Sequence, residues 1–365
     1  MTDYRLEYPV NYDQIDPFKV VAQERARATD ENIGRMGLKV VTESRGESGF
    51  VIEFPDRYLV FVVEGLGTKN RIADSLRLAS GEEHYSSIAR CLLATYANDA
   101  LTLGAEVFTV GTIIDAGASE WFADERRYEA FCNGFAEACN DIGAVWGPGE
   151  SAHLPGIIMP DRASLSGACI GQISPKDALT LRRKIKAHDR ILLLPSSGIH
   201  ANYLTACYEL ARQLPEGFET RLETGETYGE ALLAPTVLYQ PAIMSLMAAG
   251  ILPNYMVHIT GHGWRKLMRA QVEWTYVIEE LPAVPSVCKF VKESGDLSDY
   301  EAYAHMNMGA GFAVVVASDQ ADQAQEVLAR YHPGTVLAGY VTEGPRSVFI
   351  KPLGVQYADN ELVIR

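Results

Sequence analysis

The chain lacks the features that most directly assign a protein to a class. Its 365 residues contain six cysteines, none of them in a Cys-x-x-Cys pair, so neither a zinc ribbon nor a dense disulfide framework is expected. It has no GxxxxGKS/T or GxGxxG motif, which excludes the P-loop and the dinucleotide fingerprint. The first residues, MTDYRLEYPVNYDQ, contain no apolar core of a signal peptide, and we expect a cytoplasmic protein.

Positive charge is also scarce, with 32 Lys and Arg against 47 Asp and Glu, a net charge of −15. An acidic surface repels phosphate backbones and anionic membranes, so we expect neither a nucleic-acid partner nor a membrane partner. The longest stretch without charged residues, 231–264, is interrupted by prolines and does not resemble a membrane span. An apolar content of 47% and this length predict a globular protein of two domains.

Helical and strand-like segments alternate along the chain, which favours an α/β or α+β fold with mixed sheets flanked by helices. We expect helices over 17–35, 84–103, 124–142, 200–213, 229–249 and 319–331. We expect strands over 49–54, 58–64, 106–114, 166–172, 191–194, 255–259 and 312–317. The charged segment 175–190 predicts a connection between domains 1–174 and 175–365.

Glycine turns and paired polar residues at the ends of these elements are candidate anion and metal sites. After the strand 58–64 come Gly65, Gly67, Thr68 and Lys69, which offer backbone amides and an ammonium to phosphate, while Glu64 could bind Mg²⁺. Taken alone, this stretch is better explained as an ordinary polar turn. The pair Asn98 and Asp99 lies inside an apolar helix, where a solvated face and a metal ligand are about equally good explanations.

Three later turns carry candidate side chains. Gly147–His153 presents Glu150 on a glycine turn, which suits a hard cation, although alone it is better explained as structural. Ser196–Asn202 follows a buried strand and contains His200, a candidate acid or base. His258–Gly263 places two histidines near glycines, but we interpret His258 as a core residue and His262 as solvated.

The order and spacing of these turns resemble the aminoimidazole ribonucleotide synthetase (phosphoribosylformylglycinamidine cyclo-ligase) family. Its pattern reads DGVGTK, ND with QGAEP, GGETAEMPG, SSGxHSNGY, LLxPTRIY, HxTGGG and FNxGxGM. The matching stretches are Glu64–Lys69, Asn98–Glu106, Gly147–Gly156, Ser196–Tyr203, Leu232–Tyr239, His258–Gly263 and Asn307–Phe312. The resemblance as a whole extends over residues 45–345, with the matching stretches in the order of the family pattern.

The resemblance implies a two-domain ATP-binding fold, an active site between the domains, and a homodimer formed through the first domain. It implies ATP and Mg²⁺ as cofactors and a phosphorylated small molecule as substrate, formylglycinamidine ribonucleotide, which is closed to aminoimidazole ribonucleotide with release of ADP and phosphate. By position, the implied metal ligands are Glu64, Asp99 and Glu150, and the implied catalytic residues are His200, Asp99 and Lys69. The implied nucleotide residues are Gly65, Gly67, Thr68, Lys69 and Asn98; the substrate residues are Ser196, Ser197, Gly198, Asn202, Thr260, Gly261, His262 and Arg265.

The chain departs from the family pattern at Pro148, His153, Tyr203, His262 and Trp264–Lys266, so the resemblance predicts ATP use more strongly than the acceptor. Alternatives are therefore another ATP-dependent kinase or synthetase of the superfamily, or a non-catalytic nucleotide-binding homologue. Arg265, Lys266 and Arg269 form a local basic patch that either binds an anionic group of the substrate or is a solvated helix end.

Overall fold

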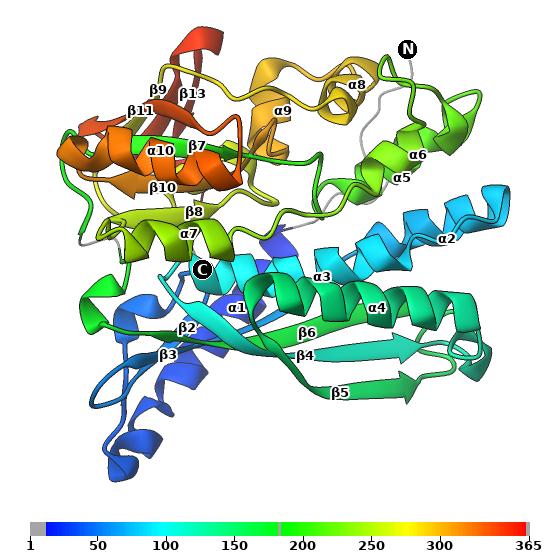
Figure 1. Cartoon of the computed structure of the whole chain (residues 1–365), viewed down its shortest axis with the longest axis horizontal. Helices are drawn as coiled ribbons and strands as arrows, with labels where there is room; N and C mark the ends of the chain where they lie inside the picture. Colours follow the sequence, from blue (N-terminus) through cyan, green and yellow to red (C-terminus); the bar gives the residue numbers. More distant parts are fainter. Residues whose placement is uncertain (1–11, 182–183, 363–365) are drawn as a thin grey trace.

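The computed structural model describes residues 12–181 and 184–362, which form two halves, each built on one β-sheet (Figure 1). The helices are α1 (Tyr12–Arg27), α2 (Lys69–Ser80), α3 (Tyr85–Leu101), α4 (Glu125–Ile142), α5 (Leu204–Ala211), α6 (Tyr228–Leu232), α7 (Gln240–Ala248), α8 (Ser286–Ser294), α9 (Asp299–His305) and α10 (Ala321–Tyr331). The strands are β1 (Lys39–Val40), β2 (Phe50–Glu53), β3 (Tyr58–Gly65), β4 (Glu106–Ala116), β5 (Val145–His153), β6 (Ala163–Ile173), β7 (Arg190–Pro195), β8 (Tyr255–His258), β9 (Trp274–Ile278), β10 (Ala310–Val316), β11 (Val336–Glu343), β12 (Ser347–Ile350) and β13 (Val355–Ala358).

The first half is a six-stranded sheet covered by helices on one face. Its strand order is β1-β2-β3-β6-β4-β5, and only the pairing of β4 with β5 is parallel. Alternate side chains of β3 point to opposite faces, so Val60 and Val62 are buried on the helical side while Phe61 and Val63 are exposed on the bare side. Helices α3 and α4 cover the side that faces the second half (Figure 1).

Helix α4 shows how the local sequence fixes these elements. Asp124 caps its first turn by accepting a hydrogen bond from the backbone N–H of Arg127, and Gly143 ends the helix at a φ of 69°. Phe131, Phe135 and the other buried residues recur every three or four positions and pack toward α3. The sequence therefore predicts α4 almost to the residue.

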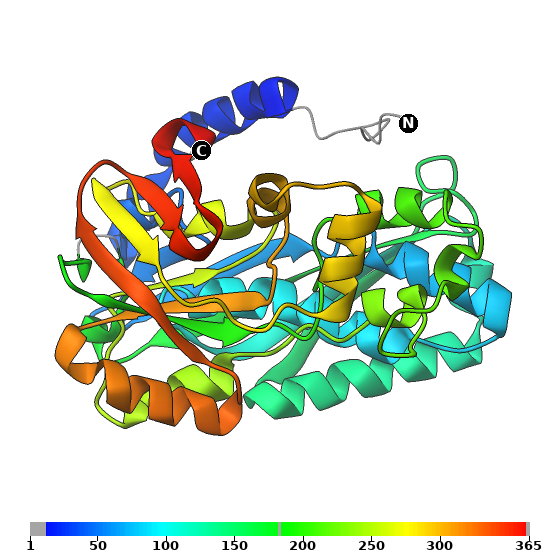
Figure 2. The ribbon, with the colours of Figure 1, turned by 90° about the horizontal axis from the view of Figure 1, so that it is seen from above.

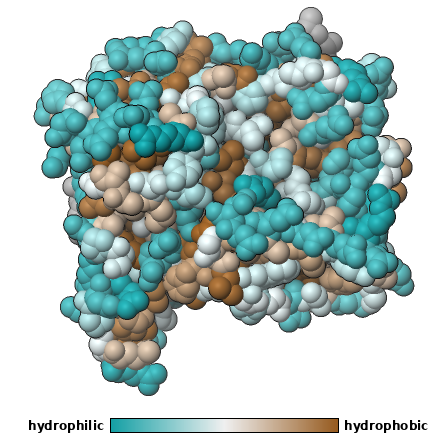
Figure 3. Space-filling view, in the orientation of Figure 1, coloured by the Kyte–Doolittle hydropathy of each residue, from teal (hydrophilic) through white to brown (hydrophobic). Residues whose placement is uncertain are grey.

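The second half is a seven-stranded sheet of order β13-β12-β9-β11-β7-β10-β8, in which only β9 and β12 are parallel. Its central strands are apolar on both faces, because helices α7 and α10 cover one side and loops and helices cover the other. Figure 2 shows both sheets from above, with α1 lying outside the body of the molecule. Figure 3 shows that hydrophilic residues cover most of one face, with smaller apolar patches between them.

The segment 233–240, which we call the seam, joins the second half to the first. Its backbone carbonyls at positions 233, 234 and 237 accept hydrogen bonds from side chains of the first half, Ser87, Lys69 and Asn98. At its end, the side-chain amide of Gln240 bonds the backbone N–H and C=O of Val107 at 2.8 and 3.1 Å. Many polar groups of the seam are therefore satisfied by side chains and backbone of α2, α3 and β4.

Several expectations from the sequence are confirmed and three are corrected. The helices 84–103, 124–142 and 319–331 and all seven expected strands are present within a few residues. The helix predicted over 229–249 is wrong, because the seam separates α6 from α7, and the helix predicted over 17–35 ends at Arg27 before a short 3-10 turn. The turn predicted at Gly147–His153 is instead edge strand β5, and helix α2 was not predicted at all. None of the helices in residues 12–181 and 184–362 has both the length and the apolar character needed to cross a membrane.

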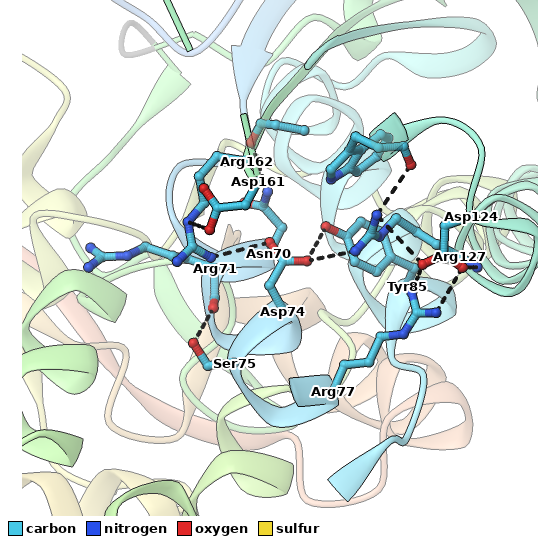
Figure 4. A network of polar contacts seen from close by, with 12 residues as sticks. Asn70, Arg71, Asp74, Ser75, Arg77, Tyr85, Asp124, Arg127, Asp161 and Arg162 are labelled. Carbon is cyan, nitrogen blue, oxygen red and sulfur yellow. Dashed lines mark hydrogen bonds and ion pairs between the residues drawn. The ribbon is translucent and has the colours of Figure 1, made fainter. Parts of the chain in front are cut away.

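A buried charge network holds α2 against its neighbours (Figure 4). The Asp74 carboxylate is only 5% exposed and accepts a hydrogen bond of 2.8 Å from the Tyr85 hydroxyl of α3. Arg127 of α4 and Arg162 of the loop before β6 each lie 3.7 Å from Asp74. Burial raises the pKa of Asp74, while Tyr85 and the two guanidinium groups oppose that rise. Helix α2 follows directly on the turn Gly65–Thr68, so the network holds the helix that begins at the end of this turn.

Candidate functional site

A cavity of about 350 Å³ is lined by residues of both halves. The end of β3, the last turn of α3, the loops after β7 and β8, and the 3-10 turn Gly263–Met268 all contribute to it. Seven residues expected from the sequence lie in its wall, namely Glu64, Gly65, Asp99, His200, Asn202, Thr260 and His262. Segments 200 residues apart in the chain thus meet at one concave surface, which is the usual setting of a small-molecule site.

An aspartate–histidine pair lies in the wall of this cavity. The Nδ1 atom of His258 is 2.7 Å from the Asp99 carboxylate, and the two side chains are 4% and 11% exposed. Burial would raise the pKa of Asp99, but the hydrogen bond from His258 and the charge of Lys266 outweigh it and lower that pKa. Burial lowers the pKa of His258, so the pair is a charged carboxylate and a neutral imidazole near pH 7. Nδ1 therefore carries the proton, and Nε2 is a buried acceptor with no hydrogen-bond partner among the described residues.

His200 has the opposite hydrogen-bonding character to His258, because the ring nitrogen that it presents is a donor rather than an acceptor. Its side chain is 1% exposed, and burial lowers its pKa well below the ordinary value, so the ring is neutral. Its Nε2 atom accepts the backbone N–H of Ser197 at 3.2 Å, which places the proton on Nδ1. Nδ1 has no partner among the described residues, so His200 presents a hydrogen-bond donor rather than a base. This differs from the acid–base role that the sequence suggested for His200.

Two cationic side chains stand beside the carboxylates. Lys266 is 8% exposed, and burial lowers its pKa to about 8, against opposing effects of Asp99 and Glu64, so it remains mostly protonated at pH 7. Its ammonium donates a hydrogen bond to the hydroxyl of Thr260. The surrounding protein and the charge of Asp99 raise the pKa of Glu64. Arg269 also lines the cavity and lowers the pKa of both carboxyl groups.

Several residues expected to contact nucleotide hold the two halves together instead. Lys69 is fully buried, and its ammonium donates to the backbone carbonyls of His200 at 2.9 Å and Ala234 at 2.7 Å. Asn98 donates to the carbonyl of Val237 and accepts the backbone N–H of residue 239. These side chains position the cavity wall, and neither of them is part of its lining.

The remaining residues expected in the glycine turn and the serine turn also lie outside the cavity lining. Gly67 and Thr68 lie outside the cavity lining, and the Thr68 hydroxyl is 3.2 Å from that of Thr205. The Ser196 hydroxyl donates to the side chain of Asn307, and the Ser197 hydroxyl donates to the carbonyl of residue 235. The carbonyl of Gly198 accepts a hydrogen bond from the side-chain amide of Asn307. These bonds hold the serine turn in place outside the cavity lining.

Two further residues expected to bind substrate, Gly261 and Arg265, do not line the cavity. Gly261 lies beside the Asn202 side chain but not in the lining, and Arg265 points away from the cavity. The Arg265 guanidinium donates to the carbonyls of His262, Ala304 and Glu361, which ties the 3-10 turn to α9 and to the end of the chain. Of the expected basic patch, only Lys266 and Arg269 face the cavity.

Glu150 does not join Glu64 and Asp99. It lies on edge strand β5, and the pairings β3–β6, β6–β4 and β4–β5 separate it from Glu64 by three strand spacings, roughly 14 Å at about 4.8 Å each. Residues 12–181 and 184–362 contain no cluster of three or more His, Cys, Asp or Glu side chains able to hold a metal ion. One Asp99 oxygen is bonded to His258, and two cations stand nearby, so the residues present do not fit a resident Mg²⁺.

Comparison with known proteins assigns the chain to a family. Two family models match it, the N-terminal domain of AIR synthase related proteins over residues 46–173 and the C-terminal domain over residues 186–351. The chain belongs to the AIR synthase related protein family. Within this family, phosphoribosylformylglycinamidine cyclo-ligases resemble it over most of their length. That of Oceanobacillus iheyensis is 31% identical over 298 residues, covering 80% of this chain and 83% of that protein. That of Methanococcus vannielii is 27% identical over 320 residues, covering 87% and 88%.

Solved structures of other proteins share the fold. A chain of a HypE–HypF complex gives a TM-score of 0.61 at 17% identity, covering 86% of this chain and 92% of that one. AaThiL, solved with AMPPCP and TMP, gives a TM-score of 0.59 at 13% identity, covering 97% and 98%. The two-sheet architecture expected from the sequence is therefore confirmed as that of this family.

The main residue that the sequence did not reveal is His258. Its signal was present, since it ends an apolar strand directly before a glycine turn, but an isolated histidine there is most simply a core residue. Thr95 of α3 also lines the cavity without any motif to mark it, and Thr236, which belongs to the matching stretch Leu232–Tyr239, lines it too. Only the approach of α3 to β8, which lie about 150 residues apart, makes His258 a partner of Asp99.

Proposed function

We propose that the protein is an ATP-dependent cyclo-ligase of purine biosynthesis, which converts formylglycinamidine ribonucleotide to aminoimidazole ribonucleotide with release of ADP and phosphate. The observation that carries the proposal is the cavity itself. It gathers Glu64, Asp99, His200, Asn202 and Thr260 from four separate motifs, in a chain whose family relatives include cyclo-ligases.

The two histidines supply complementary groups for such a ring closure. Nδ1–H of His200 donates to the formyl oxygen of the substrate, and Nε2 of His258 accepts the proton that the amidine nitrogen loses, with Asp99 holding the His258 ring in place. Asn202 and Thr260 orient the substrate from the neighbouring loops after β7 and β8. Bound ATP would supply the phosphoryl group that makes the formyl oxygen a leaving group.

A polyphosphate suits the charges of this wall. Lys266 and Arg269 bring two positive charges to a protein whose net charge is −15, and Gly65 leaves room for a close approach. Lys69 and Asn98 act by positioning this wall. Mg²⁺, which accompanies ATP in solution, would be carried mainly by the nucleotide phosphates.

Complementation of a purine auxotroph that lacks this step, paired with detection of the aminoimidazole product in vitro, tests the proposal. We expect the wild-type chain to restore growth, and His258→Gln to lower kcat at least about tenfold because the acceptor at Nε2 is lost. Lys351→Met, on the surface of the second half, is the matched control and should complement like the wild type. Growth and product formation by the wild type are both required, and absence of product would reject the cyclo-ligase assignment.

A second candidate is an ATP-dependent kinase or synthetase of the same superfamily with another acceptor. It is favoured by Tyr203, which stands where the family pattern has glycine. The φ of Tyr203 is 61°, and its ring stacks on the ring of His305. This ring occupies the turn that follows Asn202. ADP formation with a different phosphorylated acceptor, but not with formylglycinamidine ribonucleotide, would select this candidate.

We also propose a homodimer formed through the bare face of the first sheet. Five apolar side chains are exposed on strands β3, β4 and β6, which are Phe61, Val63, Phe108, Ile113 and Ile170. A patch of this kind is typical of a protein interface. Val63→Asp should produce a monomer in sedimentation equilibrium at micromolar concentration, whereas Leu78→Asp, on exposed helix α2, should not. A monomeric wild type would contradict the dimer.

A further inference from the structure

A single buried ammonium group serves both carboxylates of the cavity. Lys266 lies in the 3-10 turn Gly263–Met268, directly after the glycine turn that follows β8. Lys266, Glu64 and Asp99 all line the same cavity. The hydrogen bond from Lys266 to Thr260 fixes the ammonium in the wall. One buried protein cation thus faces the cavity that both carboxylates line.

A second cation reinforces this arrangement. The Arg269 guanidinium donates to the carbonyl of Gly46 at 3.1 and 3.3 Å and lies 4.0 Å from the Glu47 carboxylate. Anchored in this way, Arg269 lines the same cavity as Glu64 and Asp99. A divalent cation bound to the carboxylates would meet two fixed positive charges.

The donor set is also unsuited to a small hard cation. Mg²⁺ requires near-octahedral oxygen coordination, usually with one or two free carboxylates and several waters. One oxygen of Asp99 already accepts a hydrogen bond of 2.7 Å from His258. Only the second oxygen of Asp99 and the carboxylate of Glu64 would then be available as metal ligands. Arginine and lysine, by contrast, are the standard protein partners of phosphoryl oxygens.

We propose that Lys266 takes the place of a protein-bound divalent cation at Glu64 and Asp99 and binds a phosphoryl oxygen of the ligand directly. The nature of the ligand rests on the function proposed above, whereas the exchange of a metal ion for an ammonium does not. The apo protein consequently has no divalent-metal site of its own at these carboxylates. Removing the ammonium should both create such a site and weaken the binding of phosphate-containing anions.

The first experiment measures Mn²⁺ binding to the full-length protein by electron paramagnetic resonance, without nucleotide. Wild type, Lys266→Arg and the control Lys351→Met should show no saturable site below about 1 mM. Lys266→Met should gain one site at least about tenfold tighter, and the double variant Lys266→Met/Asp99→Asn should lose it again. Tight Mn²⁺ binding by the wild type that Asp99→Asn abolishes and Lys266→Met does not strengthen would overturn the proposal.

The second experiment measures binding of pyrophosphate by calorimetry in the presence of EDTA. Wild type and Lys266→Arg should bind it, while Lys266→Met should bind at least about tenfold more weakly and Lys351→Met should match the wild type. Equal affinities of wild type and Lys266→Met would refute direct contact. If Lys266→Met does not fold, as judged by circular dichroism, Lys266→Gln replaces it in both experiments. Neither measurement uses turnover, so failure of the cyclo-ligase proposal appears separately, in the product assay.

Discussion

Replacement of Lys69 by methionine separates a structural role of this residue from a role in binding nucleotide. The position of Lys69 after the glycine turn suggested contact with phosphate, but its ammonium is fully buried and bonded to two backbone carbonyls of the second half. Lys69→Met retains most of the volume of the side chain and removes both hydrogen bonds. We therefore expect the free energy of unfolding to fall.

The size of this loss follows from two opposing contributions. Each hydrogen bond to a charged donor contributes about 1.5–3 kcal/mol, and two buried carbonyls would be left without a partner. Methionine avoids the desolvation cost of a buried ammonium, which offsets part of the loss. A net destabilisation of about 2–4 kcal/mol corresponds to a lower Tm by about 3–5 °C for a chain of this length.

Differential scanning calorimetry and denaturant unfolding measure the stability, and steady-state kinetics measure the KM for ATP. Lys351→Met is the matched control, because the ion pair that Lys351 forms with Glu279 is exposed and its removal should leave Tm unchanged. A Lys69→Met protein as stable as the wild type but with greatly weakened ATP binding would refute the structural explanation.

Three other changes have defined outcomes. Gly311→Ala places a methyl group 2.0 Å from the Tyr239 hydroxyl and 2.7 Å from Cε1 of His200, and should cost about 1–3 kcal/mol and lower kcat, while Gly34→Ala, with open space around it, should do neither in the same unfolding and kinetic assays. Arg265→Ala removes hydrogen bonds to backbone carbonyls and should lower Tm without raising the KM for the phosphorylated substrate; a large rise in KM would restore a binding role. Burial lowers the pKa of Lys266 to about 8 from 10.5, so the unfolded chain binds this proton more strongly between those values. The contribution of Lys266 to the free energy of unfolding therefore rises from pH 8 to 10.5. In urea unfolding, the free energy of unfolding of the wild type should increase relative to that of Lys266→Met across that pH range.

The sequence predicts those elements whose local pattern agrees with their tertiary surroundings. Helix α4 is of this kind, with Asp124 at its start, Gly143 after its end and apolar residues at helical spacing. Strand β5 is the opposite case. Gly147, Pro148 and Gly149 indicate a turn, but Pro148 is tolerated on an edge strand that pairs only with β4.

The same distinction holds for the candidate site. Glu64, Asp99 and His200 could be proposed as functional residues because each follows a recognisable strand, helix or turn. The environment of each could not be predicted, because it depends on partners far away in the chain. The bond between Asp99 and His258 joins residues 159 positions apart, and the burial of Lys69 depends on a carbonyl 165 positions away.

The seam also bears on how the molecule unfolds. Several backbone groups of the seam have their hydrogen-bond partners in the first half, and they would lose those partners if the halves separated. The backbone N–H groups of Thr236 and Tyr239, bonded to Cys91 and Asn98 of α3, should exchange with solvent as slowly as those of the central strands. The two sheets, although separate hydrogen-bonded structures, would then melt together as one cooperative unit.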